Sequence, residues 1–199
     1  MLKKFTLFLF VSLLLIMSKS FADYPTTDTD FSMLPPFCRV KLKPRSDAET
    51  NSWSERLNVR GVGYGHVHHY CAALHSLRVA NEILPINPSR AQDKRGLYSS
   101  VLGEVKYMEE HADPNFILFP NIYATKAEAL FALDRPGEAA VYLTKAINKN
   151  RAFTKAYKML ADYYIKTGNK KSAIEILQEG IKYSKKPRGL QKRLDTLSK

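Results

Sequence analysis

The sequence predicts an all-α fold, a short α-solenoid of about three helical hairpins. First, residues of the same kind recur 34 positions apart between Pro120 and Pro187, and a fixed period of that length is the signature of stacked helix–turn–helix units. Second, apolar residues in 66–113 fall at three- and four-residue steps, which marks helices with one buried face. Third, Pro85 and Pro88 divide that stretch into two helices.

The 34-residue repeat pairs small with small and large with large residues. The matched pairs are Tyr123 and Tyr157, Ala127 and Ala161, Leu130 and Tyr164, Asp134 and Gly168, Ala139 and Ala173, Leu143 and Leu177, and Ala146 and Gly180. This pattern resembles the tetratricopeptide repeat (TPR) superfamily. It departs from that family at Lys126, where leucine is usual, and neither repeat has the typical proline at position 32. The predicted helices are 121–133 and 137–148 in the first repeat, and 153–167 and 170–183 in the second.

Residues 1–22 have the form of a signal peptide. Lys3 and Lys4 precede an apolar run from Phe5 to Met17, and Ser20-Phe21-Ala22 supplies small residues at a cleavage site. The run is shorter than the roughly 20 residues that span a bilayer. We therefore expect export, most simply to a periplasm, with secretion or tethering by a retained signal as alternatives.

Residues 23–65 are predicted to form an extended N-terminal arm with one short helix at 51–60, which contains Trp53. Prolines in 23–36 disfavour helix in the first part. The run Gly61-Val62-Gly63-Tyr64-Gly65 lacks the strand and the spacing of a nucleotide-binding fingerprint. It is interpreted as a flexible lead into the next helix.

The helical domain is predicted over 66–199. It begins with a divergent hairpin at 66–113, which resembles an atypical terminal repeat. Two repeats follow at about 120–153 and 154–187. A capping helix at 188–198 has Leu190, Leu194 and Leu197 on one side. Two repeats alone are too few for a stable fold, because such arrays need about three.

The net charge of +12 is unevenly distributed along the chain. Residues 149–199 contain 14 Lys and Arg against 4 Asp and Glu, a net +10. This basic C-terminal face can contact anionic envelope components. Nucleic acid is not expected as a partner, because export separates the protein from it and no aromatic–basic motif of RNA binding is present.

Cys38 and Cys71 are the only cysteines of the chain. An isolated pair in an oxidising compartment is read most simply as one disulfide. It would fasten the arm to the first long helix and stabilise the fold by roughly 3–4 kcal/mol in the chain-entropy model.

A competing interpretation gives the same helix a metal or thiol function. His68, Cys71 and His75 share one helix stripe, and His66 or His111 can complete a tetrahedral site. A disulfide and a thiolate ligand exclude each other at Cys71, so no metal site is favoured. A catalytic Cys71–His75 pair lacks an oxyanion site and an orienting third group. No cofactor is expected, and the motif of c-type haem attachment is absent.

The histidine-rich stretch 66–71, preceded by Pro35-Pro36-Phe37-Cys38, resembles exported TPR proteins of proteobacteria. The resemblance to TPR proteins implies a peptide groove on the concave face, formed by the first helix of each repeat. The positions that match are Asn121, Ala124, Glu128, Phe131 and Ala132, and then Lys155, Lys158, Asp162, Ile165 and Lys166.

That groove is mixed, with an apolar patch at Phe131 and Ile165 beside three lysines. It suits a peptide with an acidic end. It does not resemble the chaperone-binding TPR type, which has asparagine where this chain has Glu128 and Asp162. The sequence thus predicts a non-catalytic scaffold or adaptor that binds a protein or peptide. The alternatives are a metal- or thiol-handling protein and an envelope-associated assembly factor.

Overall fold

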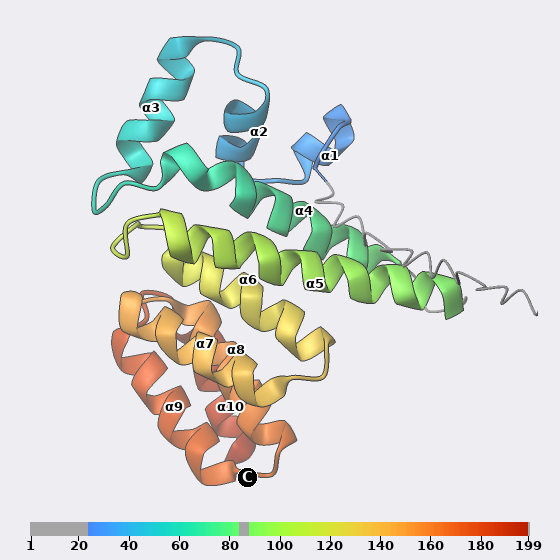
Figure 1. Cartoon of the computed structure of the whole chain (residues 1–199). Helices are drawn as coiled ribbons and strands as arrows, with labels where there is room; N and C mark the ends of the chain where they lie inside the picture. The colour runs from blue at the N-terminus through green and yellow to red at the C-terminus, as the bar shows by residue number, and fades with distance from the viewer. Residues whose placement is uncertain (1–23, 84–87, 199) are drawn as a thin grey trace, which may run out of the picture.

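A computed structural model describes residues 24–83 and 88–198 of the 199-residue chain. The described part consists of helices and connections and contains no strand, which confirms the all-α prediction (Figure 1). The helices are α1 (Asp28–Ser32), α2 (Pro36–Leu42), α3 (Asp47–Leu57), the 3₁₀ turn η1 (Tyr64–His66), α4 (Val67–Glu82), α5 (Pro88–His111), α6 (Phe119–Ala132), α7 (Pro136–Lys149), α8 (Thr154–Lys166), α9 (Lys170–Tyr183) and α10 (Arg188–Leu197). None of these helices is long and apolar enough to cross a membrane.

The helices stack as successive hairpins, α4 with α5, α6 with α7 and α8 with α9, and α10 packs on α9 (Figure 1). Helices α2, α4, α6, α8 and α10 are linked one to the next, and we name them the first-helix row. The links are the Cys38–Cys71 disulfide, the Tyr70–Thr125 hydrogen bond, the Lys155–Glu128 ion pair and the Arg193–Asp162 ion pair. The molecule is therefore an α-solenoid.

The N-terminal arm is not extended, and that prediction is wrong. Thr27 forms a capping box with Asp30 and starts α1. Pro36 occupies the first turn of α2, where a missing N–H costs nothing. Ser46 accepts a hydrogen bond from the Glu49 N–H and starts α3, so this helix begins and ends earlier than the predicted 51–60.

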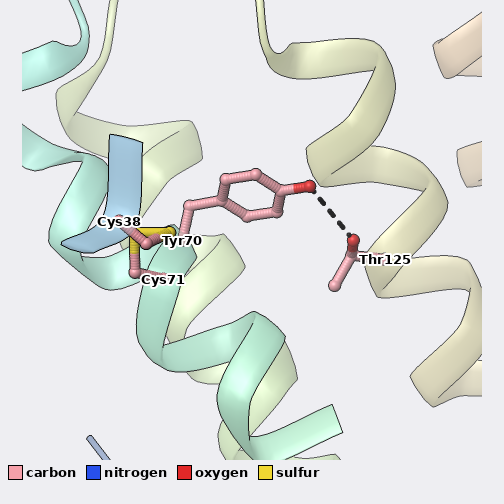
Figure 2. The surroundings of a disulfide bond; sticks show 4 residues. All are labelled: Cys38, Tyr70, Cys71 and Thr125. Atoms are coloured by element: carbon pink, nitrogen blue, oxygen red, sulfur yellow. Dashed lines mark hydrogen bonds between the residues drawn. A yellow bond between two sulfur atoms is a disulfide. The ribbon is translucent and has the colours of Figure 1, made fainter. Parts of the chain in front are cut away.

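The predicted disulfide is present and joins α2 to α4. The Cα atoms of Cys38 and Cys71 are 5.5 Å apart, and both residues are fully buried. Figure 2 shows the bridge on one side of α4 and Tyr70 reaching from the same helix to Thr125 of α6. The rings of Phe37 and Tyr70 stack, with their centroids 6.4 Å apart. Helix α2, the disulfide bond and the first hairpin (α4 with α5) thus share one hydrophobic core.

The two repeats have the same backbone at the end of their first helices. Asp134 adopts φ 61° and Gly168 adopts φ 74°. In each case the following N–H reaches back across the last turn, from Arg135 to the Leu130 carbonyl and from Asn169 to the Tyr164 carbonyl, both at 2.9 Å. This is the left-handed helix end that favours glycine. It gives the Asp134–Gly168 pair of the sequence repeat a physical cause.

The glycine run after α3 is packed rather than flexible. A Cβ on Gly63 would lie 2.4 Å from the Phe116 ring, so only glycine fits there. The Asp113 N–H donates to the Val62 carbonyl at 2.7 Å, and Asn58 Oδ1 accepts from the Gly63 N–H at 2.9 Å. The run holds the α3–α4 connection against the α5–α6 connection.

Candidate peptide-binding surface

The predicted groove residues lie on α6 and α8, which are neighbours in the first-helix row. Most are solvent-accessible, but Ala124 is fully buried. Its place in the groove is therefore wrong, because its side chain packs inside the solenoid and presents no surface to a ligand. Asn121, Lys155, Lys158 and Lys166 are exposed.

Two ion pairs neutralise part of the predicted groove. Lys155 pairs with Glu128 across α6 and α8. Asp162 accepts two hydrogen bonds from the Arg193 guanidinium, at 2.8 and 3.3 Å, and this fork ties α8 to α10. Lys158 and Lys166 have no acidic partner among the described residues, so they are the groove lysines left to meet a ligand.

Two apolar groove residues, Phe131 and Ile165, accompany these two lysines. The Phe131 ring of α6 packs 6.0 Å from the Tyr163 ring of α8, and the side chain of Ile165 is 38% exposed. Lys158, Asp162, Ile165 and Lys166 share one side of α8, because the last three are four, seven and eight positions after Lys158. We name the groove residues Phe131, Ile165, Lys158 and Lys166 the aromatic–lysine patch. Tyr163 lies outside the groove positions of the family and, two positions from Ile165, packs from another side of α8.

Residues 120–193 match the family model described as tetratricopeptide repeat. The C-terminal part of the chain is a tetratricopeptide repeat domain. The match covers α6 to α9 and most of α10, so the aromatic–lysine patch lies within the repeats.

No curated protein matches the chain. Among solved structures, the chain is similar to the "First TPR of Spaghetti (RPAP3) bound to HSP90 peptide SRMEEVD", at 20% sequence identity and a TM-score of 0.45. The similarity covers 63% of this chain and 92% of that chain.

Lys126 occupies the position where the TPR family usually has leucine, and it is 9% exposed. Its ammonium bonds to Glu109 of α5 at 2.6 Å and lies 4.1 Å from the centroid of the Tyr142 ring. A buried charge is tolerated when it is paired in this way. The lysine therefore replaces apolar packing with an ion pair that connects the divergent hairpin to the TPR domain.

The residues considered as possible metal ligands do not come together at one site. Cys71 is bonded to Cys38, and His75 Nδ1 lies 3.9 Å from Asp30 Oδ1 of α1. His66 instead lies beside His111, with ring centroids 5.7 Å apart. Across 24–83 and 88–198, no group of three His, Cys, Asp or Glu side chains is placed to hold a metal ion.

The structure instead gathers three histidines around Tyr107 of α5, and His68 lies beside one of them, His69. His69 and His111 stack on the Tyr107 ring, at 3.6 and 3.9 Å between centroids, and His69 Nδ1 lies 2.5 Å from Glu104 Oε2. Burial lowers the pKa of His68 from its ordinary value, with smaller effects from the charges of His69, Lys41 and His66. This cluster packs α4 on α5.

Proposed function

We propose that the protein is an exported, non-catalytic adaptor that binds a protein or peptide partner with the aromatic–lysine patch of its TPR domain. The observation that carries the proposal is the combination of exposed Ile165 with two unpaired lysines on one stripe of α8. The other charges on this surface are already paired within the molecule.

The patch favours a particular kind of peptide. Apolar side chains of a ligand can bury against Phe131 and Ile165, and burial contributes about 25 cal/mol per Å² of apolar area. Asp or Glu of the ligand can pair with Lys158 and Lys166, which selects an acidic peptide and speeds its association. We therefore propose an acidic segment with at least one large apolar side chain, bound along the first-helix row.

A photo-crosslinking residue at position 165 tests this proposal in cells. We expect Ile165→p-benzoyl-phenylalanine to yield a discrete adduct, whose peptide is sequenced by mass spectrometry. Val141 of α7 is the matched control, because it is 55% exposed but lies outside the first-helix row. The same adduct from both positions, or an adduct from position 141 alone, would refute the patch as the binding surface.

Charge reversal then tests the ligand chemistry. Lys158→Glu/Lys166→Glu is expected to abolish the adduct at position 165, because it places acids opposite acids. Lys170→Glu/Lys171→Glu changes the net charge equally on α9 and should leave the adduct intact. Loss in both double variants would indicate a general charge effect and not recognition by the patch.

Export is tested separately, by the mass of the protein recovered from the cell envelope. Cleavage after Ala22 is expected from the sequence Ser20-Phe21-Ala22. A chain that retains residues 1–22 would support the tethered alternative, and a protein confined to the cytoplasm would refute export.

A further inference from the structure

One edge of the solenoid is built from four connections that are distant in the sequence. They are 58–66 before α4, 112–118 before α6, 150–153 before α8 and 184–187 before α10. Arg60, Asn115 and Lys149 line one cleft of about 330 Å³, which places the first three side by side. Thr154 and Ser184 share a hydrogen bond that brings the third and fourth together. Figure 1 shows the first two connections at the left. We name this the connection edge.

The connection edge is strongly basic. Its connections contain Arg60, Arg151, Lys185 and Lys186 but a single acid, Asp113. The adjoining helix ends add the cations Lys149, Lys182 and Arg188, and the acid Glu110, which pairs with Lys106 at 3.6 Å. Within the described chain, Arg151 is the one of these seven cations that forms an ion pair, at 3.2 Å from Glu179. The other six charges face solvent, since all six residues are exposed.

The turns within the two repeat hairpins are different. Residues 133–135 contain one acid and one base, Asp134 and Arg135, and residues 167–169 contain no charge. The α2–α3 connection, residues 43–46, contains Lys43 and Arg45, of which Lys43 pairs with Asp28 at 3.1 Å. Among the connections of the repeats, the positive charge thus lies on this edge. The N-terminal arm, which has no excess of positive charge in residues 23–65, contributes Arg60 to this edge only through the fold.

Exposed apolar side chains accompany the cations. Val59 and Val62 flank Arg60 and are 62% and 67% exposed, more than any other large hydrophobic residue of the described chain. The connection that bears them is held firmly, since Val62 and Gly63 bond to Asp113 and Asn58. Two aliphatic side chains are therefore presented at a fixed place among unpaired cations.

We propose that the connection edge binds the surface of a membrane that contains anionic lipids, independently of the peptide-binding patch. Each Lys or Arg near such a surface contributes about 1 kcal/mol, and small apolar side chains bury in the interfacial region. A single-stranded nucleic acid would need exposed aromatic rings for stacking. Tyr183, the ring beside Lys182, is instead covered by the Arg151 guanidinium at 3.9 Å.

Vesicle co-sedimentation of the purified protein tests the proposal. We expect binding to vesicles of phosphatidylcholine mixed with phosphatidylglycerol to exceed binding to phosphatidylcholine alone, and the difference to shrink with added salt. Lys185→Gln/Lys186→Gln should weaken the phosphatidylglycerol-dependent binding about 30-fold, since it removes two contacts. The matched pair Lys170→Gln/Lys171→Gln, at the start of α9 and off this edge, should change it less than about threefold.

A local measurement identifies the surface that meets the lipid. Amide hydrogen exchange should slow in residues 58–63 and 184–187 when phosphatidylglycerol vesicles are added, and Val62→Ser should weaken binding while Val141→Ser does not. Equal losses from both lysine pairs, or unchanged exchange in these connections, would overturn the proposal. Capture by dextran sulfate without any binding to vesicles would overturn it in favour of a soluble anionic polymer.

Discussion

Cys38 and Cys71 show how much of the N-terminal region depends on two side chains. They are 33 positions apart in the sequence, and the bridge between them joins α2 to α4 inside a shared core. Their burial keeps both sulfur atoms away from solvent. Phe37 and Tyr70 are the chain neighbours of the two cysteines, and their rings pack on each other, while Trp53 packs on Phe37, so aromatic rings surround this part of the core.

Removal of the disulfide should lower the free energy of unfolding by about 3–4 kcal/mol, because the denatured chain regains the freedom of a closed loop. The measurement is urea unfolding of Cys38→Ala/Cys71→Ala. Cys38→Ala alone is expected to cost nearly as much as the double change, because either substitution breaks the same bond. Single substitutions that add up to the double one would contradict this explanation.

His68 predicts a pH dependence of stability. Its pKa in the folded protein is below the ordinary 6.5 of the unfolded chain. The unfolded state therefore binds the proton first, and stability falls as the pH drops below about 6.5 until the folded pKa has been passed. Above that range His68 is neutral in both states and contributes no pH dependence.

His68→Gln should flatten this dependence, because glutamine does not titrate. We expect the free energy of unfolding to fall less between pH 7 and pH 5 in the variant than in the parent protein, measured by urea unfolding at each pH. The other histidines of the cluster are present in both proteins. Parallel curves would show that burial of His68 does not cause the dependence.

At the scale of the element, Gly180 illustrates why the small positions of the repeat matter. A Cβ at this residue of α9 would lie 2.7 Å from Tyr157 of α8 and 2.8 Å from Leu190 of α10. Gly180→Ala should therefore destabilise the protein by about 1–3 kcal/mol through overpacking. Thermal and urea unfolding both measure it.

Gly189 of α10 is the matched control for this prediction, since nothing lies within 4 Å of a Cβ built there. Gly189→Ala should be neutral or stabilise by up to about 1 kcal/mol, because alanine favours helix. If both substitutions stabilise, the close approach of α8, α9 and α10 at Gly180 is not real.

Element boundaries were predictable where the signal was local. The helices of the two repeats begin and end within two residues of their predicted positions, because proline, asparagine and left-handed residues mark their ends. Helices α1 and α2 were missed, since they are only 5 and 7 residues long and the prolines between them disfavour one continuous helix. Their stability comes from contacts with α4, through Asp30 with Arg78 and Cys38 with Cys71.

At the scale of the molecule, each hairpin of a solenoid is stabilised only by contacts with the hairpins next to it. Two hydrophobic clusters reflect this. One contains residues from Leu34 to Leu133, the other residues from Ala127 to Leu190, and Leu102 and Tyr123 pack against both. Damage at one end should consequently remain near that end.

Amide hydrogen exchange of Cys38→Ala/Cys71→Ala tests this expectation. Protection should fall in α2, α3 and α4, while α8, α9 and α10 keep the protection of the parent protein, because their main contacts are with α6, α7 and one another. The matched experiment is Gly180→Ala, in which the loss should fall on α8 to α10 instead. Uniform loss over all helices in either variant would show that the molecule unfolds as one unit.

The sequence by itself determined the all-α repeat architecture and the pairing of its two cysteines. The architecture follows from periodicity and helix-end residues, which act between near neighbours in the chain. The pairing follows from composition, because the chain contains only two cysteines. Tertiary structure decided which charges remain free and where they gather. Lys155 and Asp162 acquire partners from other helices, and Arg60 lies beside Lys149 although 89 positions separate them. Such neighbours are created by packing, and no local pattern encodes them.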